Sequence, residues 1–178
     1  REFAPSSANK NIFLNPDNSN MKFLKALNTD TSVGIPGLYN MLADAHHEHG
    51  IIKWNQLFQD SLIFSKGFFI SKRLNKLLNC ATHIQKDKYA MQIYFNKNKP
   101  KEVGEIVNNE KLYISLKDLS QNPYSIKDGN LANSIANKMK YKITLKDLKS
   151  WKTIKRNPIC MNYYGYSEKI IISRKNKN

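Results

Sequence analysis

The stretch from Ser32 to Phe68 reads SVGIPGLYNMLADAHHEHGIIKWNQLFQDSLIFSKGF, and the rest of the chain is organised around it. It opens with a short apolar extended piece that meets a Gly-x-Pro-Gly corner and turns directly into a helix. Pro36 suits a first helical turn, because its φ is fixed and its missing N–H is not needed there. Gly34 and Gly37 allow two stretches of backbone to approach closely. The sequence therefore predicts a strand-to-helix corner at residues 33–37.

Two amphipathic helices are predicted to follow the corner. Apolar residues recur at helical spacing in both, so we expect one face of each helix to be buried. Gly50 ends the first helix as a C′ glycine, and Gly67 ends the second. Two helices attached to one strand need a sheet to cover. The predicted buried faces are Leu38, Met41, Leu42 and Ala45 in the first helix and Trp54, Leu57, Phe58 and Leu62 in the second.

The first 31 residues are predicted to be irregular. Pro5 and Pro16 stand among asparagine, aspartate and serine residues, which are turn formers. After the strand-helix-helix unit at 32–68, leucines recur at intervals of three and four residues, which predicts further helices within 71–151.

Capping residues mark several of the expected helix starts. Ser71 can cap one helix, and Thr144 with Asp147 forms a capping-box-like start for another. The stretch 86–101 mixes aromatic residues with lysine and asparagine, and fits either a short helix or a packed loop. Near the end of the chain, apolar residues occupy every second position, which predicts strands within 158–173. Two more helix starts are expected at 107–109 and at Gly129.

The formal net charge of +15 favours anionic partners, but its make-up argues against specific nucleic-acid binding. Lysine supplies almost all of the charge, whereas arginine is the residue favoured for bidentate phosphate contacts. Asparagine is as conspicuous as lysine, and both are read by A/T-rich codons, so drift of composition explains both. The alternative is a non-enzymatic, basic, helix-rich module that binds nucleic acid or an acidic partner. Its binding would weaken steeply with salt.

Three kinds of site find little support in the sequence. No apolar run approaches the length of a membrane-spanning helix. Cys80 and Cys160 have no metal-type spacing, and we expect two unpaired, partly buried thiols. His46 and His49 could share a face with Glu48, but they lack the H-E-x-x-H arrangement and further ligands. The alternative is that these histidines occupy the last turn of a helix, where the helix dipole favours them. We expect no metal and no cofactor.

Six segments, in order and at matching spacing, resemble the gamma-glutamyltransferase family. Each is weak alone, but together they are specific and run nearly end to end, over the middle and later part of the family's large subunit. The segments are Arg1-Glu2-x-Ala4-Pro5, Val33-Gly34-Ile35-Pro36-Gly37, Gly104-x-x-Val107, Gly129-x-Leu131-Ala132-x-x-Ile135, Thr144-Leu145-x-Asp147-Leu148-x-x-Trp151 and Tyr163-x-Gly165-Tyr166.

Departures from the family pattern occur at three places. Lys140-Tyr141-Lys142 stands where the family has Gly-Gly, and Lys53 stands where it has proline. Residues 167–172 replace a P-P-P-S-S-G-G stretch. No segment resembles the family's small subunit, and the chain is expected to be a truncated or decaying reading frame or one piece of a split protein.

The resemblance implies a fold and an activity. The family fold is the four-layer αββα sandwich of N-terminal nucleophile hydrolases, so 1–178 would be a partial, helix-rich α+β domain of the large subunit. The family hydrolyses or transfers γ-glutamyl groups of glutathione and related amides. An N-terminal threonine in the small subunit attacks the amide, with its own α-amine as base, and forms a γ-glutamyl ester. The family also implies a periplasmic or extracytoplasmic location.

One site residue carries over from the family. Arg1 matches the arginine of R-E-x-A-P, which in the family grips the α-carboxylate of the γ-glutamyl group; the alternative is a frayed terminal arginine. The expected partners are a γ-glutamyl substrate and the remaining large-subunit and small-subunit segments. No catalytic residue carries over, so the chain alone is expected to be inactive, because none of its threonines has the context of the nucleophile: Thr29, Thr31, Thr82, Thr144 and Thr153.

Overall fold

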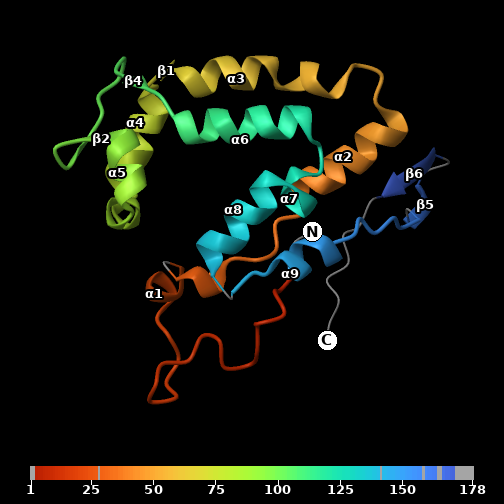
Figure 1. Cartoon of the computed structure of the whole chain (residues 1–178), viewed down its shortest axis with the longest axis horizontal. Coiled ribbons are helices and arrows are strands. Elements are labelled where there is room, and N and C mark those ends of the chain that lie inside the picture. Colours follow the sequence, from red (N-terminus) through yellow and green to blue (C-terminus); the bar gives the residue numbers. More distant parts are fainter. Residues whose placement is uncertain (1–2, 28, 141, 158, 164–165, 171–178) are drawn as a thin grey trace.

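Short helices dominate the part of the chain that the structure describes, and the strands in this part form three separate antiparallel pairs (Figure 1). The computed structural model describes residues 3–27, 29–140, 142–157, 159–163 and 166–170. The helical elements are α1 (Phe23–Leu27), η1 (Asp30–Ser32), α2 (Leu38–His49), η2 (Trp54–Phe58), α3 (Gln59–Lys66), α4 (Lys72–Cys80), η3 (Thr82–Lys86), α5 (Lys88–Tyr94), α6 (Glu110–Gln121), α7 (Ser125–Asp128), α8 (Asn130–Met139) and α9 (Leu145–Ser150). The strands are β1 (Phe68–Phe69), β2 (Phe95–Asn96), β3 (Lys99–Pro100), β4 (Ile106–Val107), β5 (Ile159–Tyr163) and β6 (Tyr166–Ile170).

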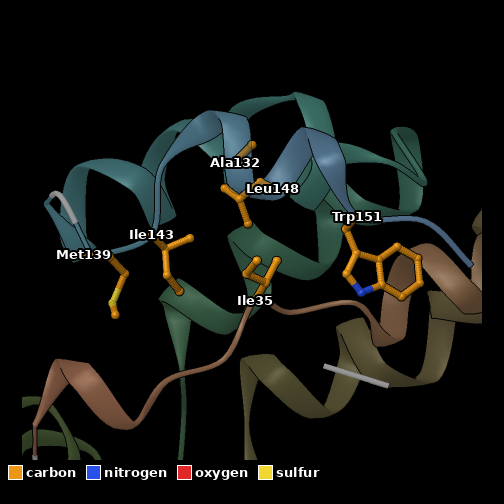
Figure 2. Packing of buried hydrophobic residues seen from close by; sticks show 6 residues of the cluster. All are labelled: Ile35, Ala132, Met139, Ile143, Leu148 and Trp151. Carbon is orange, nitrogen blue, oxygen red and sulfur yellow. The ribbon is translucent and has the colours of Figure 1, made fainter. Parts of the chain in front are cut away.

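The first hydrophobic core joins the 33–37 corner to the later helices α8 and α9 (Figure 2). Ile35 from the corner is almost fully buried, and Trp151 covers it from the segment that follows α9. The remaining members of this core are Ala132, Met139, Ile143 and Leu148. The corner therefore packs against residues about 100 positions later in the chain.

The second core lies beneath α4, α5 and the strand pairs β1–β4 and β2–β3. Phe68 pairs with Val107 and Phe69 with Ile106, which brings the start of α4 beside the strand that precedes α6. Lys97 and Asn98 both have positive φ, of 46° and 70°, and make the tight turn between β2 and β3. Such a turn matches the natural twist of a hairpin. The core residues are Ile70, Leu78, Ile93, Phe95 and Val107.

The third core holds α6 against the helical unit η2–α3, and the two helices run side by side (Figure 1). Phe58 is buried here with Leu116 and Leu119. The indole N–H of Trp54 donates to the carbonyl of Leu119 at 2.8 Å, which fixes η2 on α6.

Ser71 and Thr144 start their helices as capping residues, as predicted, and Asn109 caps α6 at the end of the stretch 107–109, where a helix start was expected. The side chains of Ser71, Asn109 and Thr144 each accept a hydrogen bond from the backbone N–H three residues later. At α9 the Asp147 carboxylate also bonds back to the Thr144 N–H, which completes a capping box. These bonds satisfy backbone donors that a helix start leaves unpaired.

The predicted buried face of α2 is wrong. Leu38 and Leu42 are 60% and 42% exposed, whereas the buried residues of α2 are Asn40 and Ala43 on the opposite face. Met41 alone of the predicted set packs on the first core. The inward face was missed because it carries polar residues, and periodicity alone does not say which neighbour a helix meets.

Two turn residues act differently from the prediction. Pro36 precedes the helix instead of opening it, since Gly37 is the N-cap of α2. Gly50 ends α2 with φ −72° and is not in the left-handed region. Position 50 has room only for glycine, because a Cβ there would collide with the His46 side chain.

Three features of the structure differ from the sequence predictions. The hairpin β2–β3 follows α5 within the stretch predicted as either a helix or a loop, and β4 includes Val107, where a helix start was expected. The Cys80 thiol is exposed instead of partly buried. Gly165 and residues 171–173, where a turn and part of a strand were predicted, lie outside the described residues.

Candidate functional site

The predicted substrate-binding residue, Arg1, lies outside the described residues, but the segment that follows it is firmly attached. Phe3 forms an antiparallel bridge with Ile35, whose N–H donates to the Phe3 carbonyl at 2.8 Å. The Phe3 ring meets the Trp151 indole edge-on, with ring centroids 6.5 Å apart. Phe3, the third residue of the R-E-x-A-P motif, therefore lies alongside the 33–37 corner, on the first core.

Asp147 binds the same segment through a hydrogen bond. The Ser6 N–H donates to Asp147 Oδ1 at 3.0 Å, while Asp147 Oδ2 accepts from the Thr144 backbone and hydroxyl. The Ser7 hydroxyl adds a bond of 2.7 Å to the Lys142 carbonyl. Burial of Asp147 acts to raise the pKa of its carboxyl, but the hydrogen bonds from Thr144 and Ser6 outweigh it and lower that pKa.

Trp151 closes this arrangement against the start of α2. Its indole covers Gly37 so closely that a Cβ on the glycine would overlap the ring, and its side chain is almost fully buried. Four of the motifs that resemble the family thus meet on one core, although they are far apart in sequence. Each motif was visible in the sequence, but their convergence was not, because it depends on long-range contacts.

A polar cluster on the inward face of α2 holds the segment after α9. Asp44 accepts hydrogen bonds from the Tyr124 hydroxyl at 2.7 Å and from the Thr153 hydroxyl. The Thr153 bond is the main cause that lowers the pKa of Asp44, and the Asp44 carboxylate in turn raises the pKa of Tyr124. One turn later Glu48 pairs with Lys155, and this exposed contact lowers the pKa of Glu48.

The spacing of these contacts shows how the segment runs. Trp151 lies on Gly37, Thr153 on Asp44 and Lys155 on Glu48. Two residues of extended chain advance about 6.6 Å, and four residues of α-helix advance about 6 Å. The segment from 151 to 155, which we call the strap, therefore stays in step with α2 between Thr153 and Lys155, where it follows the turn from Asp44 to Glu48, and it precedes the hairpin β5–β6 in the chain.

The hydroxyls of the threonines that the structure describes take part in local structure. Thr29 donates to the Ala26 carbonyl at 2.7 Å and shares a short contact with Thr31. Thr144 caps α9, and Thr153 binds Asp44. The Thr82 side chain lies outside the described residues. These hydroxyls therefore help to position backbone segments.

The histidine group of α2 has a structural role. His46 Nε2 bonds to the Ile52 carbonyl at 2.7 Å and packs edge-on against the Trp54 ring, which folds the connection back onto the helix. Across the described part of the chain, no three His, Cys, Asp or Glu side chains gather as a metal site would require. Within that part, no helix has the length and apolar character needed to cross a bilayer.

The sequence of this chain is similar to that of known proteins along nearly its whole length. The gamma-glutamyltranspeptidase family model matches residues 1–171. Glutathione hydrolase 2 of Arabidopsis thaliana is 29% identical over 172 residues, which are 93% of this chain and 29% of the plant protein. The glutathione hydrolase proenzyme of Escherichia coli is 27% identical, over 93% of this chain and 30% of its own length. The chain thus spans less than a third of these curated relatives.

The fold agrees with the family as well. Gamma-glutamyltranspeptidase of Helicobacter pylori superposes on 97% of this chain with a TM-score of 0.86 at 24% identity, and this chain covers 51% of that solved chain. The helix-rich arrangement therefore matches part of an N-terminal nucleophile hydrolase structure. With the family model matched along nearly its whole length, the chain belongs to the gamma-glutamyltranspeptidase family.

Proposed function

We propose that this chain is a structural and substrate-anchoring part of an enzyme that hydrolyses or transfers γ-glutamyl groups of glutathione and related amides. The family match over residues 1–171 supports this proposal most directly. In the whole enzyme, the chain would supply outer helices and a few strands of the αββα sandwich. A periplasmic or extracytoplasmic location goes with the same proposal.

The proposed chemistry is acyl transfer, with the nucleophile supplied by another part of the enzyme. The N-terminal threonine of the small subunit would attack the γ-glutamyl amide and form an ester, which water or an amino-acid acceptor then resolves. The engaged hydroxyls of Thr29, Thr144 and Thr153 support a role for this chain outside the acyl-transfer step. The chain alone is therefore inactive in this proposal.

Arg1 is proposed to bind the α-carboxylate of the γ-glutamyl group. A planar guanidinium makes a bidentate, charge-assisted pair with a carboxylate, which lysine cannot reproduce. The attachment of the following segment supports the assignment, because Phe3 and Ser6 bind two different parts of the first core. The backbone that follows this motif's first two residues is thus anchored from Phe3 onward.

The test uses a chimera in which this chain replaces the matched segment of the Helicobacter pylori enzyme. Losing a charge-assisted hydrogen bond costs about 2 kcal/mol, so Arg1→Ala should raise KM for a γ-glutamyl anilide about 30-fold. Arg1→Lys, which keeps the charge, should raise KM by less. The matched control is a substrate analogue that lacks the α-carboxylate, whose turnover should not respond to either substitution. If both substrates lose the same factor, Arg1 is not the anchor.

A further inference from the structure

The strand pair β1–β4 turns one of its two faces to solvent. Phe68 pairs with Val107, and Phe69 pairs with Ile106. Val107 is fully buried in the second core, and successive side chains of a strand point to opposite faces, so the next pair along the ladder points away from that core. Phe69 is accordingly 68% exposed and Ile106 57% exposed. The ladder therefore presents an aromatic and an aliphatic side chain next to each other on the surface.

The loop before β4 extends this apolar surface. The Ile70 carbonyl accepts from the Gly104 N–H at 3.0 Å, and the Ile70 N–H donates to the Glu105 carbonyl at 2.8 Å, which holds the loop against the segment that leads into α4. Val103, next to Gly104, is also exposed. Three apolar side chains thus stand in the open on one unit joined by backbone hydrogen bonds, at the end of the helix pair α3–α6 (Figure 1).

Exposed cations follow these apolar side chains in the chain. Lys72 comes three residues after Phe69, so their α-carbons lie no more than about 11 Å apart. Lys72, Arg73 and Lys76 are all exposed, because α4 turns its other side, with Leu78, into the second core. Helix α4 contains no acidic residue, and the ion pairs in the described part of the chain are formed by other elements. The positive charge of α4 is therefore uncompensated.

A further cation lies at the ladder itself, and one of the neighbouring acids is engaged. Lys101 Nζ donates to the Ile106 carbonyl at 3.0 Å. The Glu105 carboxylate accepts hydrogen bonds from the Asn96 amide and the Glu102 N–H, so it is held within the loop, whereas Glu102 itself is exposed. The result is an apolar surface with a mostly positive margin. We call it the β1–β4 face, and it consists of Phe69, Val103, Ile106, Lys72, Arg73 and Lys76.

We propose that the β1–β4 face docks on an anionic lipid surface. Apolar side chains gain free energy when they enter the interfacial zone of a bilayer, and each lysine or arginine near an anionic leaflet adds attraction. A nucleic acid would use the cations for its phosphates, but it would leave the exposed valine and isoleucine without a role. The face lies on the second core, whereas the segment that follows Arg1 lies on the first, so the inference does not rest on the proposed function.

The first test measures flotation of the full chain with vesicles of phosphatidylcholine, alone or mixed with an equal part of phosphatidylglycerol. The chain should bind only the anionic vesicles, and added salt should weaken the binding. Replacing Lys72, Arg73 and Lys76 together by glutamine should weaken it about 100-fold, since each cation near an anionic leaflet contributes roughly a fivefold factor.

The control for charge removes three exposed lysines elsewhere and should cost far less affinity. Equal losses from the two triple variants would show that net charge alone drives the binding, and would overturn the proposal. Glu102→Gln, which removes an acid beside the face, should instead tighten the binding. The control positions are Lys22, Lys138 and Lys146.

The apolar half of the face is tested by Phe69→Ser and Ile106→Ser, each of which should weaken vesicle binding about tenfold. Ile52→Ser is the matched control, because Ile52 is also 57% exposed but lies in the connection between α2 and η2. All three side chains are exposed, so thermal unfolding should show that each variant keeps the fold. Equal losses from Ile52→Ser and Ile106→Ser would contradict the assignment of this face.

Tryptophan emission gives a second readout, which reports insertion instead of affinity. Emission of the Phe69→Trp variant should move to shorter wavelength on anionic vesicles, and emission of Ile52→Trp should not. Bound Phe69→Trp with unchanged emission would overturn the proposal, as would no flotation of the wild type with anionic vesicles at low salt. A mixed-sequence DNA duplex is measured in parallel. Tighter binding to the duplex than to the vesicles, insensitive to Phe69→Ser, would make nucleic acid the partner and contradict the proposal.

Discussion

Phe58 is the aromatic residue on which the third core depends. It is buried against Leu116 and Leu119, whereas Phe64, six residues later, is largely exposed. Removing a buried phenylalanine ring typically costs 3 kcal/mol or more, so Phe58→Ala should lower the free energy of unfolding by about 3 kcal/mol. Urea denaturation measures this, with Phe64→Ala as the control. An unchanged midpoint for Phe58→Ala would show that this face is misassigned.

Asp44 gives the stability of the chain a pH dependence with a defined sign. Its hydrogen bonds lower its pKa below the ordinary value of 3.8, with the Thr153 hydroxyl as the first cause. A lowered pKa means that the ionised carboxylate stabilises the fold above that ordinary value, and that this gain is lost as pH falls through the folded-state pKa.

The corresponding variant is Asp44→Asn. The difference in unfolding free energy between the wild type and this variant should be full near pH 6 and shrink as pH falls below about 4. Thr153→Val should weaken this pH dependence, because it removes the bond that lowers the pKa most. A difference that stays constant from pH 6 to pH 3 would mean that Asp44 is not coupled to the fold.

At the scale of elements, the fit between the start of α2 and the strap is tight. A methyl group on Gly37 would overlap the Trp151 ring, whereas one on Gly67 would meet Ile106 Cγ2 at 3.5 Å, an ordinary contact. Overpacking a filled site costs about 1–3 kcal/mol. Gly37→Ala should therefore lower the free energy of unfolding by about 2 kcal/mol. It should also expose the Trp151 ring to water, which a change in tryptophan fluorescence would report. Gly67→Ala should do neither. Equal loss from both would show that the contact with Trp151 is not the cause.

Local signals predicted the helices well, and long-range packing escaped them. Ser71, Asn109 and Thr144 cap their helices through neighbours three residues away, so their roles could be deduced from sequence. The inward face of α2 could not, because its Asp44 binds Tyr124 and Thr153, which lie 80 and 109 positions away in the chain. The β2–β3 turn was missed because its positive φ values fall on Lys97 and Asn98, without a glycine to mark them.

The candidate site also combines features that were visible in the sequence with features that only the fold revealed. The motif of Arg1 was visible in the sequence, but its support by Phe3, Ser6 and Asp147 emerged only from the fold. The strap was not predicted at all, since an extended segment in step with a helix has no periodic signature of its own. Both features depend on contacts that join the two ends of the chain.

At the scale of the whole molecule, the chain matches part of a larger fold, 51% of the solved Helicobacter pylori chain. Among the described residues, the hydrophobic side chains form three separate cores, the strands form two-stranded pairs, and Leu38 and Leu42 of α2 are exposed. The net charge of +15 makes nucleic-acid binding the alternative to the proposed function. Specific binding to DNA or RNA that weakens steeply with added salt would favour that alternative.

The most direct test of the account is the rate at which glutamate is released from a γ-glutamyl anilide by the isolated chain and by the chimera. The isolated chain should give only the background rate, because the account assigns the nucleophile to another part of the enzyme. The chimera should give turnover that falls when Arg1 is replaced. Release of glutamate by the isolated chain, abolished by substituting one of its own residues, would contradict the account, and so would a folded chimera without turnover.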